Sequence, residues 1–115
     1  MAELDVSERQ AGDVTILDLS GEVRIGDSSV ALRDTIRRLA DGGKNKLLLN
    51  LAGVKYIDSS GIGELIASYA TIRRQSGQLK LLKLTDRVQN LLVITKLLTV
   101  FDSYEDESEA LKSFQ

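Results

Sequence analysis

Apolar and polar residues alternate near the start of this chain and then take up a helical spacing. Residues 4–8 and the stretch VTILDLSG, which begins at Val14, have the pattern of strands, and the QAGD between them favours a tight reversal. In residues 30–40 the apolar side chains recur three and four positions apart, as along one face of an α-helix. The pattern therefore predicts a β-hairpin followed by an amphipathic helix. The residues placed to cap and stop that helix are Asp27, Ser28 or Ser29 at its start and Gly42 at its end.

The middle of the chain predicts a strand, a helix and a second strand. KLLLNL, residues 46–51, is a continuous apolar run, which is typical of a strand covered on both faces, as the central strands of parallel sheets are. Residues 62–72 carry another helical stripe, and SGQ around Gly77 ends it before the strand-like LKLLKL. A strand buried on both faces implies that helices cover it above and below.

The last third of the chain predicts two short helices separated by a short strand. Thr85 is placed to cap the first helix, and residues 98–101 form the predicted strand. Ser103 and Asp106 have the spacing of a capping box at the start of the second helix.

Taken together, this order of elements predicts a single α/β domain over residues 1–115. We expect a mixed, largely parallel sheet of about five strands with about four helices and an N-terminal β-hairpin. Functional sites of such sheets gather beyond the carboxyl ends of the strands. The loops expected at residues 21–27 and 52–58 follow two neighbouring parallel strands, so they should share one edge with Ser59.

Composition narrows the cellular setting. The chain has 115 residues, of which 43% are apolar and 28% charged, as in an ordinary globular domain. No apolar stretch approaches the length of a membrane span, and the first ten residues do not have the pattern of an export signal. There is no cysteine for a disulfide framework. We therefore expect a cytoplasmic protein without membrane partners.

Charge and the lack of histidine exclude several classes of function. A formal net charge of −2 gives no general attraction to phosphate backbones, so direct nucleic-acid binding is not expected. The chain has no histidine, which removes Ser-His-Asp catalysis, imidazole metal ligation and phosphohistidine chemistry. We expect neither a metal nor a cofactor.

YIDSSGIGEL, residues 56–65, holds the most informative chemistry. Asp58, Ser59 and Ser60 all have oxygens that can cap a helix, although one cap needs only one of them. Gly61 and Gly63 remove bulk from the same turn, as a docking surface requires. A phosphate on Ser59 would lie near the positive end of the helix and would add negative charge beside Asp58. The stretch is therefore either a helix cap alone or a switch of binding.

Enzymatic interpretations of the same stretch fail on spacing. GIGELI has Ile66 where a dinucleotide-binding loop needs its third glycine, and no G-K-[ST] follows for a Walker loop. Ser59 begins no S-x-x-K motif, and there is no histidine to activate it. An enzyme or a small-ligand carrier is therefore disfavoured.

With these residues assembled, the chain resembles the STAS domain family, and most closely its bacterial anti-sigma factor antagonists. The resemblance covers almost the whole chain and is most specific in NLAGVKYIDSSGIG, which is similar to the family pattern D-S-[ST]-G-[LI]-G. It implies that the serine after the aspartate, here Ser59, is phosphorylated by a partner that is both serine kinase and anti-sigma factor. Asp58, Ser60, Gly61, Gly63 and Arg24 would then contribute to partner binding.

The resemblance implies partner switching without catalysis. The unphosphorylated antagonist would bind the anti-sigma factor kinase, the phosphorylated form would be released, and a PP2C-type phosphatase would reset it. The alternative within the same family is a STAS scaffold or sensor module that regulates another output, such as a histidine-kinase or chemotaxis-type pathway.

Two positions depart from the family pattern. Arg24 stands where relatives often carry aspartate, and we expect it to pair with Asp58 or with a phosphate on Ser59. Lys96 replaces a common glycine after the third helix, where it affects the C-cap.

Overall fold

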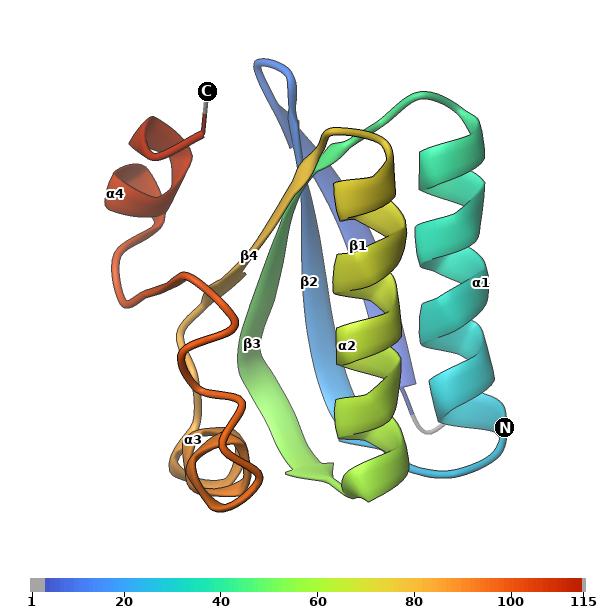
Figure 1. Cartoon of the computed structure of the whole chain (residues 1–115), viewed down its shortest axis with the longest axis vertical. Helices are drawn as coiled ribbons and strands as arrows, with labels where there is room; N and C mark the ends of the chain where they lie inside the picture. Colours follow the sequence, from blue (N-terminus) through green and yellow to red (C-terminus); the bar gives the residue numbers. More distant parts are fainter. Residues whose placement is uncertain (1–3, 115) are drawn as a thin grey trace.

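The structure is a computed structural model that describes residues 4–114 (Figure 1). Strands and helices alternate after an initial pair of strands, as the sequence predicts. The elements are β1 (Leu4–Ala11), β2 (Val14–Val23), α1 (Asp27–Asp41), β3 (Lys46–Ile57), α2 (Ser59–Arg74), β4 (Gln78–Leu82), α3 (Asp86–Ile94), β5 (Ser103–Tyr104) and α4 (Glu107–Lys112).

The strands form one sheet in the order β1-β2-β3-β4-β5. β1 and β2 form an antiparallel hairpin, and the remaining neighbours pair in parallel. This confirms the predicted fold class, a mixed and largely parallel sheet of five strands with four helices over the described residues. Because β2 and β3 are parallel neighbours, the segments that follow them emerge at the same edge of the sheet.

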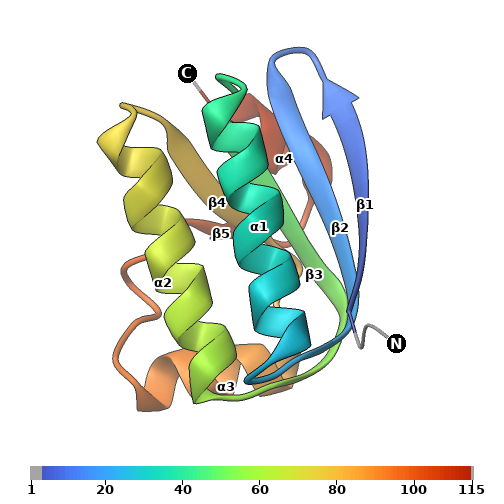
Figure 2. The same ribbon diagram turned by 90° about the vertical axis from the view of Figure 1, so that its right-hand side faces the viewer.

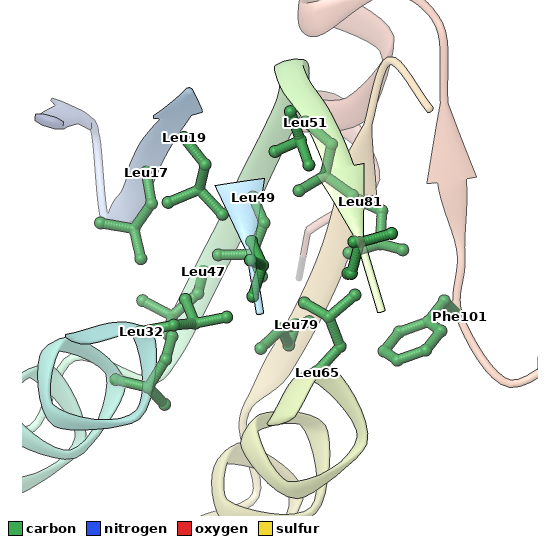
Figure 3. Packing of buried hydrophobic residues seen from close by; sticks show 14 of the residues in the cluster. Leu17, Leu19, Leu32, Leu47, Leu49, Leu51, Leu65, Leu79, Leu81 and Phe101 are labelled. Atoms are coloured by element: carbon green, nitrogen blue, oxygen red, sulfur yellow. The ribbon is translucent and has the colours of Figure 1, made fainter. Parts of the chain in front are cut away.

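Helices cover the two faces of the sheet unequally. α1 and α2 lie side by side on one face, the short α4 lies on the other, and α3 crosses the end at which β3 finishes and α2 begins (Figures 1 and 2). The larger core lies between the sheet and α1 and α2, and Leu47, Leu49 and Leu81 are completely buried in it (Figure 3). Leu48 faces the smaller core under α4. β3 is therefore covered on both faces, as its continuous apolar run predicts.

No helix within residues 4–114 is long and apolar enough to cross a membrane.

Three segments differ from the sequence prediction. The loop expected at residues 21–27 is shorter, because β2 continues to Val23 and α1 begins at Asp27. The loop expected at residues 52–58 is mostly strand, because the second half of β3 continues its pairing with β2 as far as Val23 opposite Ile57. The strand expected at residues 98–101 is wrong. The strand is instead Ser103–Tyr104, which pairs with Leu81 and Leu82, while Phe101 turns into the core against Tyr69. The apolar residues at 98–101 have the pattern of a strand, but they precede β5 and are not part of it.

Helix caps also differ from the prediction at two places. α1 begins after Gly26, which has no side chain to act as a cap, and the Ser28 hydroxyl is engaged instead with the backbone N–H and C=O of Arg24. α4 is capped by Asp106, whose carboxylate accepts from the Glu109 amide, while Ser103 belongs to β5. Thr85 caps α3 as predicted, accepting from the Val88 amide.

Three helices end in the same geometry. After α1, α2 and α3 the chain enters a left-handed conformation at Gly43, Ser76 and Lys96, with φ of 83°, 58° and 62°. After α3 the amide of Lys96 donates to the Val93 carbonyl and that of Leu97 donates to the Leu92 carbonyl, which is the Schellman arrangement. Gly42 is the C-cap of α1, as predicted, but the left-handed residue is the next one.

Candidate functional site

Asp58 caps the helix that begins at Ser59. Its backbone is extended, with φ −105° and ψ −175°, and its Oδ1 accepts a hydrogen bond from the Gly61 amide at 2.9 Å. This pairs one of the amides that the first helical turn leaves without a partner. Of the three residues that could cap this helix, Asp58 is therefore the one that does, and the interpretation of Ser60 as the cap is wrong. Ser60 is the second residue of the helix, where its position no longer suits a capping side chain.

The same carboxylate joins the two segments at this edge of the sheet. Asp58 Oδ2 accepts from the Ile25 amide at 3.1 Å, and the Asp58 amide donates to the Val23 carbonyl at 3.2 Å. Ile25 lies in the connection between β2 and α1, so that connection is fixed against the start of α2. The predicted meeting of these segments beside Ser59 is confirmed.

Hydrogen bonds keep the Asp58 carboxylate ionised. Desolvation by burial acts to raise its pKa, but the backbone amides of Gly61, Ile25 and Ser60 donate to the charged form, and the positive charge of Arg24 adds to their effect. The result is a pKa below the ordinary value for aspartate. Asp58 is therefore a fixed negative charge directly before Ser59.

The two serines have different surroundings. Ser59 is exposed at the first position of α2, and Ser60 is half-buried. Because Asp58 supplies the cap, the Ser59 hydroxyl is not needed to begin the helix. A group added to Ser59 would meet solvent and the amino-terminal end of α2.

The two glycines of this turn also have different surroundings. A Cβ built on Gly61 would lie 2.6 Å from Ile57 Cγ1 and 2.7 Å from the Val23 carbonyl oxygen, so only glycine lets α2 approach the ends of β2 and β3. A Cβ on Gly63 would meet nothing within 4 Å. Gly61 is thus required by packing, whereas Gly63 leaves an exposed part of α2 without bulk.

Arg24 does not form the expected ion pair with Asp58. Its Nε lies 2.8 Å from Glu22 Oε1, but the N–H direction misses the carboxylate, so this ion pair includes no hydrogen bond from that buried nitrogen. The guanidinium carbon of Arg24 lies 4.2 Å from the centre of the Tyr56 ring. Arg24 acts on Asp58 through its charge and through the backbone of the neighbouring Ile25.

Tyr56 and Arg87 are residues of the site that the sequence did not identify. The guanidinium carbon of Arg87 also lies 4.2 Å from the Tyr56 ring centre. The Tyr56 ring is therefore in contact with two arginines that come from different segments of the chain. Tyr56 lies two positions before Asp58, so its place in the sequence could have identified it as part of the site. Nothing near Arg87 in the sequence points to its contact with Tyr56.

Among residues 4–114, no cluster of three or more acidic side chains is arranged to hold a metal ion. One depression of about 420 Å³ lies at the opposite end of the sheet, lined by Lys46, Arg73, Ser76, Gly77 and Gln78. Another of about 310 Å³ lies on α3 and includes Arg87 in its lining.

The arrangement at the start of α2 consists of the exposed Ser59 hydroxyl and the ionised Asp58 carboxylate, and Arg24 and Arg87 contact Tyr56, which lies close to Asp58 in the sequence.

This chain is similar in sequence and in structure to known proteins of one family. Residues 5–110 match the STAS domain family. The anti-sigma-B factor antagonist of Bacillus subtilis is 30% identical over 99 residues, which cover 86% of this chain and 89% of that protein. An anti-sigma factor antagonist of Mycobacterium paratuberculosis has a similar structure, with a TM-score of 0.82 and 20% identity over 96% of this chain and 93% of that one. The phosphorylated form of SpoIIAA from Bacillus superimposes with a TM-score of 0.74 at 17% identity, over 94% of this chain and 97% of that one. This chain belongs to the STAS domain family.

Proposed function

We propose that this chain is a non-catalytic anti-sigma factor antagonist whose binding is switched at Ser59. Its unphosphorylated form binds an anti-sigma factor that is also a serine kinase, and phosphorylation of Ser59 releases it. The observation that carries this proposal is that the two adjacent residues at the start of α2 have different roles. Asp58 caps the helix, and Ser59 is left exposed. The similarity to the anti-sigma-B factor antagonist of Bacillus subtilis supports it.

The physical consequence of a phosphate at Ser59 is a change of surface without a change of fold. The group adds about −1.5 to −2 charges at pH 7. Its position at the amino-terminal end of α2 is favourable for an anion. The cap made by Asp58 is untouched, so the modified chain keeps its helix.

Release follows from the charges that are already present. A partner that fits the Asp58 and Ser59 surface must accommodate one fixed carboxylate, and Glu64 brings a second one that is paired with Arg33 at 3.7 Å. The phosphate adds charge of the same sign and bulk to this surface. A tenfold loss of affinity corresponds to about 1.4 kcal/mol, which one desolvated like-charge contact can supply. A PP2C-type phosphatase would then restore the binding form.

The direct test is the intact mass of the chain after incubation with ATP and the anti-sigma factor kinase of the same organism. We expect one added phosphate on the wild type and on Ser60→Ala, and none on Ser59→Ala. Phosphate on Ser59→Ala would place the switch elsewhere. No phosphate on any form would overturn the proposal and favour a STAS scaffold in another signalling pathway.

Binding measurements test the second half of the proposal. By titration calorimetry without ATP, Ser59→Ala should bind the kinase as the wild type does, and Ser59→Asp should bind at least tenfold more weakly. Equal binding by Ser59→Asp would contradict the repulsion mechanism.

A further inference from the structure

Exposed apolar side chains gather on the segments around Ser59. Four of the five large apolar side chains exposed among residues 4–114 belong to the β2–α1 connection, the first turn of α1 and the end of α3. They are Ile25, Val30, Val93 and Ile94, with exposed fractions of 78%, 38%, 53% and 75%. Figures 1 and 2 show α3 and the amino-terminal ends of α1 and α2 at the same end of the molecule. A concentration of apolar surface at one end of a domain is typical of an interaction site.

The exposed face of α3 forms a shallow groove. The depression of about 310 Å³ on this helix is lined by Arg87, Asn90, Leu91 and Ile94. These positions follow the i, i+3, i+4, i+7 spacing of one helix face. Val88 and Leu92 face the core instead. α3 therefore has one apolar stripe that packs on the core. Its outer face carries a second stripe, which is partly apolar and begins with Arg87.

Arg87 is held in a conformation that suits an acidic group. Its guanidinium carbon lies 4.2 Å from the centre of the Tyr56 ring, and Arg24 contacts the same ring. This cation–π contact restrains the guanidinium and does not use its N–H groups to pair with a carboxylate. Arg24 is ion-paired with Glu22, but Arg87 has no carboxylate partner within residues 4–114. A planar guanidinium of this kind pairs bidentately with a carboxylate.

Contacts connect this groove to Ser59. Arg87 and Arg24 share the Tyr56 ring, and the residue after Arg24 donates its amide to Asp58. One helical turn around Ser59 is too small for a stable complex, since each partner of a standard interface buries about 800 Å². The groove on α3 is the neighbouring surface that can complete such an area with apolar contacts.

We infer that the α3 groove is a second docking surface for the kinase that binds at Ser59 and phosphorylates it. The groove is formed by Arg87, Asn90, Leu91 and Ile94. It fits a partner segment in which a carboxylate lies beside an apolar side chain, the acid on Arg87 and the apolar group against Leu91 and Ile94. This inference rests on the proposed function, because the occupant is the same kinase. A second copy of this chain fits less well, because a two-fold contact through the groove would bring the Arg87 side chains of two copies together.

The test compares substitutions in the groove with matched substitutions outside it. Arg87→Glu reverses the charge and Ile94→Ser removes the apolar side chain. Arg73→Glu and Val100→Ser are the controls, since both residues are exposed and neither lines the groove. Thermal unfolding of all four variants checks that each is folded.

We expect Arg87→Glu and Ile94→Ser each to raise the Kd for the kinase by about tenfold or more. The KM for phosphorylation of Ser59 should rise in parallel, with kcat within about twofold of wild type. Binding of the wild type should weaken as NaCl is raised from 50 to 300 mM, and Arg87→Glu should lose much of that dependence. The controls should bind as the wild type does.

Two results would overturn the inference. If both groove variants bind the kinase within twofold of the wild type while Ser59→Asp does not bind, the proposed function stands and the groove has no part in it. If the variants instead abolish a dimer of this chain seen by light scattering, the occupant is a second copy. Failure of the wild type itself to bind or be phosphorylated removes the proposed function first, and the groove proposal with it.

Discussion

Asp58 accepts a hydrogen bond from the Ile25 amide at 3.1 Å, although the two residues are 33 positions apart in the chain. The other carboxylate oxygen accepts from the Gly61 amide at 2.9 Å. One side chain therefore begins α2 and also fixes the connection between β2 and α1. This carboxylate therefore adds to the backbone bond between Asp58 and Val23 in holding the surface around Ser59.

Asp58→Ala should destabilise the protein because it removes both hydrogen bonds. Loss of a capping side chain costs about 0.5–2 kcal/mol, and we expect a decrease in the free energy of unfolding in the upper part of that range. Urea denaturation measures it, and hydrogen exchange of the Ile25 amide should become faster. Ser60→Ala is the control and should change stability by less than about 0.5 kcal/mol. A larger loss for Ser60→Ala would mean that Ser60 is the true cap.

The contribution of Asp58 should disappear in acid. Its pKa is lower in the folded protein than in the unfolded chain, where it is about 3.9. A group with a depressed folded pKa stabilises the protein above its unfolded pKa, and this stabilisation is lost as the pH falls through the folded pKa. Asp58→Asn keeps an oxygen for the cap but loses the charge.

We therefore expect a constant difference in the free energy of unfolding between wild type and Asp58→Asn at pH 6–7. That difference should shrink as the pH falls below about 4. Urea denaturation from pH 2 to pH 7 measures it for both proteins, and the comparison removes the effects of the other carboxylates. A difference that is independent of pH would contradict the ionised state of Asp58.

Alanine at the two glycines of the site should have opposite effects. Gly61→Ala places a methyl group 2.6 Å from Ile57 Cγ1 and 2.7 Å from the Val23 carbonyl oxygen, and we expect a loss of about 1–3 kcal/mol. Gly63→Ala meets nothing within 4 Å in a helix and should stabilise by up to about 1 kcal/mol. Chemical denaturation of both variants gives the comparison. Equal effects would mean that α2 does not pack closely against Val23 and Ile57.

Lys96→Gly should stabilise the protein. Lys96 has φ of 62° at the end of α3, a conformation that costs a residue with a side chain about 1–2 kcal/mol. Glycine adopts it freely, so we expect a gain of about 1 kcal/mol after its greater freedom in the unfolded chain is counted. The measurement is the midpoint of thermal unfolding. Lys96→Ala removes the charge but keeps the strained backbone, so it should not reproduce the gain; if it does, the effect of Lys96 is electrostatic.

The order of elements and the place of the site could be predicted because their signals are local. Apolar spacing identified the hairpin, the strand buried on both faces and the helices, and DSSG marked the start of α2. Local patterns were insufficient where several residues competed for one role. Asp58 and Ser60 both suit a cap, and only the hydrogen bond from the Gly61 amide to Asp58 decides between them.

The sequence by itself determined the α/β architecture, the closeness of the two segments at the end of β2 and β3, and the candidate role of Ser59. Only the tertiary structure decided what surrounds that serine. Arg24, Tyr56 and Arg87 come from three segments, and their stacking depends on how β3 continues alongside β2 and on where α3 crosses the end of the sheet. Periodicity and capping act over a few residues, whereas contacts between distant segments arise from the packing of the whole domain.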